Sequence, residues 1–330
     1  MFPFRPAALL RSARRGLAAA SLVVLASCGG GTSRVDPFEP SRIIVFGDEH
    51  SLITDAGKKY SVNGLGATPT DGSATPIDCT VNPLWIQIVA SQFGLRFPQC
   101  ATADQASTVK GQILAEVDAR TADVLAQVQR FRATDAFSEN DLVLVFAGMH
   151  DVLDAYARFP LTDVETLKSE LFAVGQSLGR QVNAITDSGR GGRVLFVTVP
   201  DVGLTPFAEA EKAANTDVDR VVVLKALTER FNAGLRTAVT NDGSLAGLVA
   251  ADEMTQVYKR LTIAYGYTIT NSTTAACNVA LPDCTANTTI EAAAGGKVAN
   301  YLWADSLHLS ATGQAALGAV ARTRAVNNPF

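Results

Sequence analysis

The chain has 330 residues, 47% of them hydrophobic, and a formal net charge of −4. This length and apolar content suit one large α/β domain or two small ones. Four arginines and no acidic residue lie in the first 27 residues, so the rest of the chain carries a net charge of −8. A domain this acidic is a poor candidate for binding nucleic acid through phosphates, and no nucleic-acid partner is expected.

The N-terminus has the pattern of an export signal. A basic region, "RPAALLRSARRG", precedes the apolar stretch "LAAASLVVLA", which is shorter than the ~20 residues that span a bilayer. "LASC" then places Cys28 behind small residues. This resembles a bacterial lipoprotein signal, whose cysteine is lipidated; an ordinary signal peptide cut nearby is the alternative.

The sequence therefore predicts a signal peptide over residues 1–27, a lipid on Cys28, a flexible tether over 28–41 and a folded domain over 42–330. The lipid would be the chain's contact with a membrane. We expect the protein in the cell envelope, lipid-anchored, in the outer membrane, in the periplasm or at the cell surface.

Four further cysteines follow the signal, and an even number in an exported chain suggests disulfides. Of the three possible pairings, the sequence-local one joins Cys79 to Cys100 and Cys277 to Cys284. A metal site is less favoured, because neither pair has the two-residue spacing of a zinc knuckle.

Apolar runs that are typical of buried parallel strands alternate with segments of helical spacing. The expected strands are 42–48, 141–148, 193–200, 245–252 and, more weakly, 94–99; the expected helices are 82–93, 111–131, 162–186, 218–239 and 310–325. The alternation predicts an α/β fold, a three-layer αβα sandwich with a central parallel sheet.

Ligands of such sheets sit at the carboxyl ends of the strands. This places the stretches 47–55, 148–154 and 200–206 along one rim. The polar stretch 268–297 is expected as a long loop over the same rim.

Three histidines lie at this predicted rim, each with an acid nearby. His50 follows the first strand, His150 follows the strand 141–148, and His308 precedes the last helix. A hydrogen-bonded structural role is the ordinary one for a histidine, but the shared placement favours function. Asp305, three residues before His308, can meet it on one turn and stabilise its imidazolium form, as a nucleophile-activating base requires.

Six motifs occur in an order that is familiar from one family. They are "IIVFGD", "VFAGMHDVLD", "VTVPDVGLTPF", "LTERFNAGLRTAV", "AYGYTITN" and "WADSLHLSATGQAALG". Together they cover residues 42 to 325 and resemble the SGNH or GDSL esterases and lipases, particularly the bacterial phospholipase/lecithinase/hemolysin-like branch. The resemblance implies a flavodoxin-like SGNH hydrolase fold, action on carboxylic esters, a small ester or lipid substrate, and no cofactor.

The catalytic positions depart from the pattern that the resemblance implies. Glu49 stands where the family has its serine, directly after Gly-Asp, and His150 stands where it has an oxyanion-donating asparagine. The family's second-block glycine has no clear counterpart near "QCATADQAS". The closing block keeps its aspartate and histidine, Asp305 and His308. Asp48, Gly148 and His150 are the expected oxyanion or pocket residues.

Two local geometries compete after the first strand. If "EH" is looped out, Ser51 becomes the nucleophile of an ordinary esterase. If the chain continues in a helical turn, two residues rotate a side chain by ~200°, so Glu49 takes the nucleophile's place and Ser51 faces away. We favour the second geometry, because nothing else in the first block requires an insertion, and expect serine-esterase activity to be weak or absent.

The second geometry leaves three functions open. The first is an ester hydrolase of weak or lost activity, and the second is a non-catalytic ligand-binding protein on the same fold. The third is a metal-dependent hydrolase, because Glu49, His150 and His308 would make a common catalytic zinc shell. Alternatively, His150 donates a hydrogen bond where the family's asparagine does.

Overall fold

The computed structural model describes residues 37–187, 192–260, 269–290 and 300–327. The chain divides into two compact units, Met1–Pro37 and Phe38–Phe330, and the described part of the second unit holds the fold. The expected signal peptide and Cys28 lie outside the described residues.

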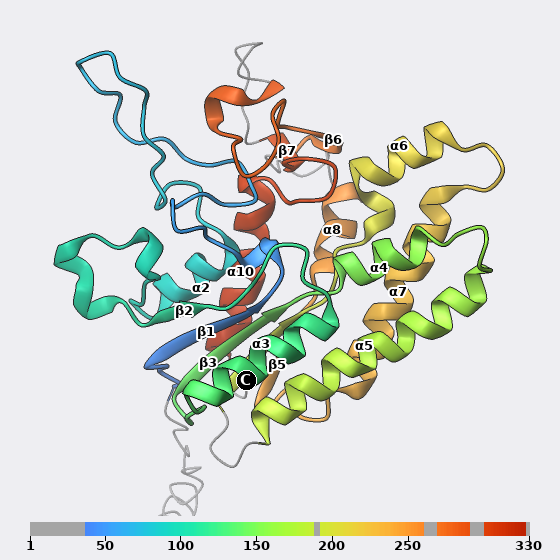
Figure 1. Ribbon diagram of the computed structural model, residues 1–330, viewed down its shortest axis with the longest axis horizontal. Helices are drawn as coiled ribbons and strands as arrows, with labels where there is room; N and C mark the ends of the chain where they lie inside the picture. The colour runs from blue at the N-terminus through green and yellow to red at the C-terminus, as the bar shows by residue number, and fades with distance from the viewer. Residues whose placement is uncertain (1–36, 188–191, 261–268, 291–299, 328–330) are drawn as a thin grey trace, which may run out of the picture. The chain divides into compact units, whose positions relative to one another are not determined.

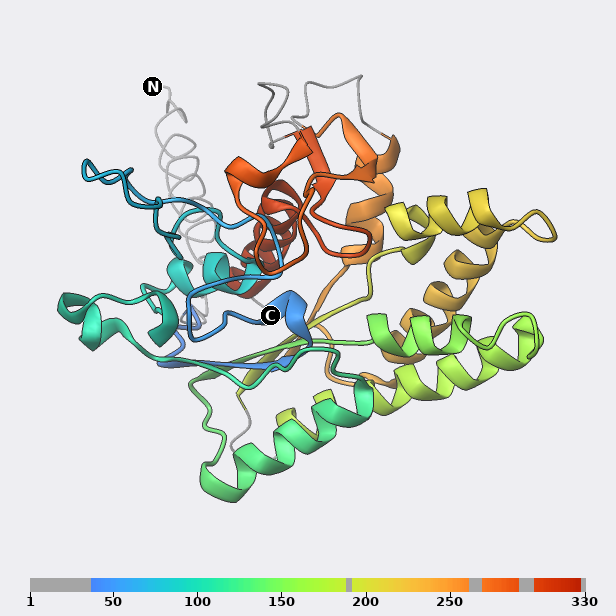
Figure 2. The same ribbon diagram turned by 45° about the horizontal axis from the view of Figure 1, so that its top comes forward.

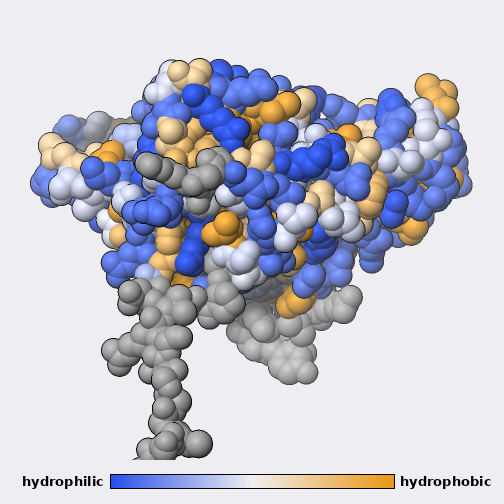
Figure 3. All heavy atoms as spheres, turned by 90° about the horizontal axis from the view of Figure 1, so that it is seen from below, coloured by the Kyte–Doolittle hydropathy of each residue, from blue (hydrophilic) through white to orange (hydrophobic). Residues whose placement is uncertain are grey.

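No described helix is both long and apolar enough to cross a membrane. On the face shown in Figure 3, the described hydrophobic residues are scattered among hydrophilic ones. This face therefore presents no continuous apolar patch among the described residues.

A parallel sheet forms the centre of this unit (Figure 1), as the sequence predicts. Its strands are β1 (Arg42–Gly47), β2 (Gly111–Ile113), β3 (Asp141–Phe146), β4 (Arg193–Val197) and β5 (Ala246–Val249). They lie in the order β2-β1-β3-β4-β5, and every pairing is parallel. This is the flavodoxin-like order, in which the strand order reverses between β1 and β3, and ligands bind at that switch point.

Helices cover both faces of the sheet. They are α2 (Trp85–Gln92), α3 (Thr121–Thr134), α4 (Met149–Tyr156), α5 (Val164–Thr186), α6 (Pro206–Ala214), α7 (Arg220–Ala238), α8 (Ala251–Arg260) and α10 (Ala311–Val326). Figure 2 shows the sheet nearly edge-on, with α3 and α5 (green to yellow-green) on one side and α10 (red) on the other.

The two layers follow from the alternation of side chains along each strand. In β1, Ile44 and Phe46 enter the core cluster with α3, α4, α5 and α7. Their neighbours Ile43 and Val45 enter the opposite cluster with α2, α8 and α10. All four side chains are fully buried, which explains why this strand reads as a continuous apolar run. The three-layer αβα prediction is confirmed.

The fifth strand of the sheet is not the one that the sequence indicates. The prediction of a strand over 94–99 is wrong: this stretch makes one bridge, from Arg96 to Val109, and ends in the 3₁₀ turn Pro98–Cys100, where proline supplies no N–H for a ladder. The prediction of a helix from residue 111 is also wrong. Gly111–Ile113 is the edge strand β2, paired with β1, and helix α3 begins at Thr121.

A second, two-stranded sheet crosses the segment expected as a loop. Strand β6 (Asn271–Ala275) pairs in parallel with β7 (Tyr301–Trp303), while residues 291–297 lie outside the described residues. Cys277 and Cys284 form a disulfide in this segment, and Cys79 and Cys100 form another, so the predicted pairing is confirmed. β7 leads directly into the loop that carries His308.

Candidate active site

Gly47 ends β1 and sets the direction of the chain that follows. Its φ is +138°, and a Cβ at this position would lie 1.9 Å from the carbonyl oxygen of Phe146 on β3. Gln127 of α3 brackets it, accepting from the Gly47 N–H at 2.8 Å and donating to its carbonyl at 2.9 Å. Asp48 then caps a 3₁₀ turn, Glu49–Ser51. This turn carries Glu49 over the carboxyl end of the sheet.

The Glu49 carboxylate has three partners, although its side chain is only 2% exposed. Its Oε1 lies 2.7 Å from His150 Nε2 and 3.0 Å from His308 Nε2, and its Oε2 accepts from the Asp118 backbone N–H at 2.8 Å. Glu49 follows β1, Asp118 follows β2 and His150 follows β3, while His308 comes from the β7–α10 loop. The predicted convergence therefore occurs at the switch point of the sheet.

His308 and Asp305 are arranged as their spacing predicts. Asp305 holds the ring at Nδ1, at 2.9 and 3.0 Å, and also accepts from the backbone N–H groups of Leu307 and His308 at 2.9 and 2.7 Å. Ser310 caps α10 and donates to the Tyr301 carbonyl. The ring is thus fixed with Nε2 directed at Glu49, where a serine-activating base would meet its nucleophile.

The charges of this group reinforce one another. Burial raises the pKa of Glu49, but the hydrogen bonds from His150 and His308 outweigh it, and the pKa lies far below its usual range. Burial lowers the pKa of His308, but the hydrogen bonds with Asp305 and Glu49 raise it to about 10. Burial lowers the pKa of His150, but the hydrogen bond to Glu49, together with the negative charges of Glu49, Asp48 and Asp118, raises it overall. At neutral pH, Glu49 is an anion facing an imidazolium at His308, which in this state cannot accept a proton.

Ser51 does not join this group. It is fully buried, and its Oγ accepts a hydrogen bond from Trp85 Nε1 at 3.2 Å, on the side of the turn facing α2. The structure therefore has the second of the two geometries considered for this stretch. The alternative, in which "EH" is looped out and Ser51 lies against His308, does not occur, because Glu49, His50 and Ser51 together form the 3₁₀ turn.

Asp48 and His50 form a second carboxylate–imidazole pair beneath the first. Asp48 Oδ1 lies 3.0 Å from His50 Nδ1, and both side chains are fully buried. The His50 ring stacks on that of His308, with centroids 4.7 Å apart and planes inclined by 28°. Among the described residues, no hydrogen-bond partner reaches His50 Nε2.

Gly148 positions His150 through backbone geometry. It joins β3 to α4 with φ +118°, and a Cβ there would lie 2.3 Å from Phe231 Cζ. Glycine is required at this turn, because an L side chain would meet both backbone strain and the ring. The structure thus gives Gly148 a packing role beside the site.

The sequence did not point to Asp118. Its backbone N–H, after β2, donates to Glu49 Oε2, and its φ is +59°. The sequence shows no counterpart of the family's second-block glycine near residues 99–107, and it predicts a helix from residue 111, where the structure has a strand. Placing a strand at 111–113 would have put Asp118 at the rim.

Two sets of described residues bring three ligand atoms within 4.8 Å of one another. They are Glu49, His50 and His308 on one side, and Glu49, Asp118 and His150 on the other. The set expected from the sequence, Glu49 with His150 and His308, is divided between them. Glu49 belongs to both sets.

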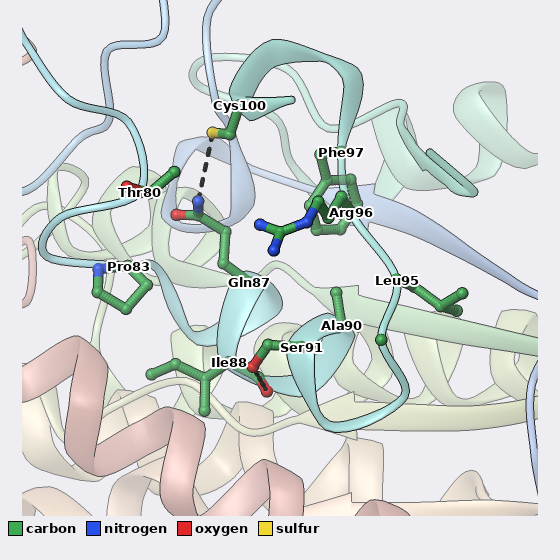
Figure 4. Close-up of a pocket in the computed structure, with 11 residues that line it drawn as sticks. Thr80, Pro83, Gln87, Ile88, Ala90, Ser91, Leu95, Arg96, Phe97 and Cys100 are labelled. Atoms are coloured by element: carbon green, nitrogen blue, oxygen red, sulfur yellow. Dashed lines mark hydrogen bonds between the residues drawn. The ribbon is translucent and has the colours of Figure 1, made fainter. Parts of the chain in front are cut away.

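Two pockets differ in their relation to this site. A pocket of about 280 Å³ lies between α2 and the segment 94–100, where Gln87 donates to Cys100 Sγ (Figure 4), and no residue of the Glu49 group lines it. A pocket of about 470 Å³ is lined in part by residues close in sequence to His150 and His308, although neither histidine nor Glu49 lines it. Its apolar lining includes Leu153, Tyr156, Phe159, Phe207 and Leu307.

The chain resembles known proteins in sequence and in fold. A family model, GDSL-like Lipase/Acylhydrolase, matches residues 43–320. The chain is 26% identical over 175 residues to the phosphatidylcholine-sterol acyltransferase of Aeromonas hydrophila, a match over 52% of this chain and 48% of the relative. The chain thus spans about half the length of that curated relative.

Among solved structures, the chain is similar to a member of the lipolytic protein G-D-S-L family from Veillonella parvula DSM 2008. It is 12% identical, with a TM-score of 0.38, and the match covers 85% of this chain and 95% of that one.

Proposed function

Because this chain belongs to the GDSL-like lipase/acylhydrolase family, we propose that it is an exported, lipid-anchored protein that acts on lipid or acyl esters without a serine nucleophile. Family membership supports the ester-hydrolysing function. The observation that supports action without a serine nucleophile is the 3.0 Å contact between His308 Nε2 and Glu49 Oε1, with Asp305 bound to the other ring nitrogen of His308. His308 and Asp305 stand where the family has its base and the base's partner, and Glu49 stands where the nucleophile would be; the contact with Glu49 keeps the ring protonated, so His308 acts as a base only after Glu49 has moved away.

The same carboxylate limits the reaction. An ester carbonyl requires hydrogen-bond donors at its oxygen in the transition state, and Glu49 already holds both His150 Nε2 and the Asp118 N–H. A carboxylate is also not a useful acyl acceptor in ordinary ester hydrolysis. Turnover through an acyl-serine intermediate is therefore weak or absent. Direct hydrolysis by water requires the Glu49 carboxylate to move away from these donors first.

The pocket of about 470 Å³ supports an acyl chain as the part of the substrate that is recognised. Its lining is mainly apolar and aromatic, and its volume of about 470 Å³ is within the range of small-molecule sites. Leu153 and Leu307 bring it within a few residues of His150 and His308. The Aeromonas relative is named for a phospholipid and a sterol, which supports a lipid ester as the substrate class.

The test is hydrolysis of p-nitrophenyl esters of increasing chain length, and of phosphatidylcholine vesicles. We expect slow turnover that falls at least ~10²-fold in His308→Ala, the lower end of a general base's contribution. Thr323→Ala, an exposed change on α10, is the control and should leave the rate unchanged. Equal rates in His308→Ala and the unaltered chain would contradict the proposal.

A non-catalytic ligand-binding protein is the second candidate. The observation that favours it is the Glu49 carboxylate, which fills the donors that a reacting carbonyl would need. Saturable binding of acyl esters with no turnover by the unaltered chain would select this candidate over the first.

The lipid anchor has its own test. Cys28→Ser should release the protein from membranes into the soluble periplasmic fraction or block its processing, because the lipidated cysteine is the proposed attachment. Membrane fractionation of both forms, with the processed mass measured, decides this. Normal processing and an unchanged membrane fraction in Cys28→Ser would show that the anchor is not at this residue.

A further inference from the structure

We propose that Glu49, His50 and His308 bind a divalent transition-metal ion, with zinc as the best fit. The proposal rests on the proposed function, because the ion would occupy the same site, where it would activate a bound water as the nucleophile in place of the missing serine and polarise the ester carbonyl. Two imidazole nitrogens and one carboxylate are a common protein shell of catalytic zinc, with a further position left for water or substrate.

The three ligand atoms are already close to one another. All lie within 4.8 Å of one another, and Glu49 Oε1 is 3.0 Å from His308 Nε2. Two ligand atoms on a tetrahedral zinc ion, each about 2.0–2.1 Å from the metal, lie ~3.3 Å apart. The Glu49–His308 pair therefore needs to open by only a few tenths of an ångström.

His50 gives the independent indication of a ligand. Its side chain is fully buried, its Nδ1 is occupied by Asp48, and no described residue offers a hydrogen bond to its Nε2. A buried polar atom without a partner costs free energy. A metal ion shared with His308 would satisfy that nitrogen, provided that the two stacked rings, whose planes are inclined by 28°, turn so that both Nε2 lone pairs point at the ion.

Both histidines are held as zinc-binding histidines usually are. A metal-bound imidazole commonly donates its other N–H to a carboxylate, which fixes the tautomer and ring orientation. Asp48 lies 3.0 Å from His50 Nδ1, and Asp305 lies 2.9 Å from His308 Nδ1. In each case Nε2 is the nitrogen left for the ion.

The second set, Glu49 with Asp118 and His150, is the weaker site. The Asp118 side chain is 73% exposed and 3.9 Å from His150 Nδ1, so little holds it in place. His150 Nε2 already has Glu49 as its partner. In our proposal His150 stays outside the metal shell, beside the open position, where its 13% exposed side chain lies at the mouth of the site.

The experiment is a calorimetric titration of Zn²⁺ into the full chain, purified without a polyhistidine tag and stripped with a chelator. We expect one ion per chain, and binding at least ~10-fold weaker in His50→Phe, which keeps a ring next to Phe146, because even losing an outer carboxylate costs 10–100-fold. Asp48→Asn should also weaken binding by ~10–100-fold. Thr323→Ala, an exposed change on α10 outside the site, is the control and should bind within ~3-fold of the unaltered chain.

Thermal unfolding of the metal-free variants shows whether each is folded; if His50→Phe is not, Asp48→Asn carries the test. Absence of saturable zinc binding overturns the proposal. So does full binding in His50→Phe and Asp48→Asn together with loss in His150→Asn, which would place the ion in the second set.

Ester assays separate this proposal from the proposed function. Hydrolysis that depends on His308 but persists in chelator, with no zinc bound, removes the metal site and leaves the ester hydrolase. Zinc bound as expected, with no ester turned over in its presence or absence, leaves the metal site and removes the hydrolase.

Discussion

A chain carrying Glu49→Ser together with His150→Asn is expected to react stoichiometrically with a fluorophosphonate. It should also hydrolyse short acyl esters at least ~10²-fold faster than the unaltered chain, the gain associated with recovering one oxyanion donor. The serine would stand against His308 Nε2, where Glu49 Oε1 now lies at 3.0 Å. Loss of the Glu49 anion would also remove one of the two hydrogen bonds that raise the pKa of His308, so the ring becomes available as a base.

The double change is needed because Glu49 and His150 depart from the family pattern together and touch each other at 2.7 Å. The same double variant with His308→Ala is the control, and should lose both labelling and activity. A double variant that unfolds cooperatively at the usual temperature, yet is neither labelled nor active, would mean that this rim no longer supports acyl transfer.

Gly47→Ala is expected to lower the free energy of unfolding by about 4 kcal/mol or more, a loss reserved for backbone and core disruptions. Its Cβ would lie 1.9 Å from a main-chain oxygen of β3, at φ +138°. To relieve this clash, β1 and β3 must separate at the end of β1, just before Glu49. Denaturant unfolding, followed by circular dichroism, measures the change.

Gly72→Ala separates the clash from the cost of the backbone conformation. Gly72 also has a positive φ, +80°, but a Cβ there meets nothing within 4 Å. Its cost should be about 1–2 kcal/mol, that of a left-handed conformation for an L residue. Losses of similar size in the two variants would show that β1 and β3 can part at little cost.

The sequence predicts those parts of the fold that are buried on both faces. β1, β3 and β4 are continuous apolar runs because successive side chains of each strand enter the two opposite cores in turn. β2 lacks this signal, since it is a three-residue edge strand whose side chains are only partly buried or exposed. A short edge strand is defined by its partner rather than by its own pattern, and Gly111 gives no hint of pairing with Ile43.

The site divides in the same way. Asp305 and His308 are three residues apart, and their contact is a local property of one turn, so their spacing predicts it. The placement of Glu49 and Ser51 also follows from local turn geometry. The roles of Asp118 and His50 depend on contacts between residues far apart in the sequence. The Asp118 N–H, at a positive φ, donates to Glu49, and the His50 ring stacks on that of His308. Neither can be seen in the residues around these positions.

The most direct test of the central claim, that Glu49 occupies the nucleophile's place, is fluorophosphonate labelling of the unaltered chain, followed by intact-protein mass spectrometry. We predict no labelling, because Ser51 Oγ is buried against Trp85 and His308 Nε2 contacts the Glu49 carboxylate rather than a serine. Stoichiometric labelling that disappears in Ser51→Ala would contradict this geometry and make the protein a conventional serine esterase.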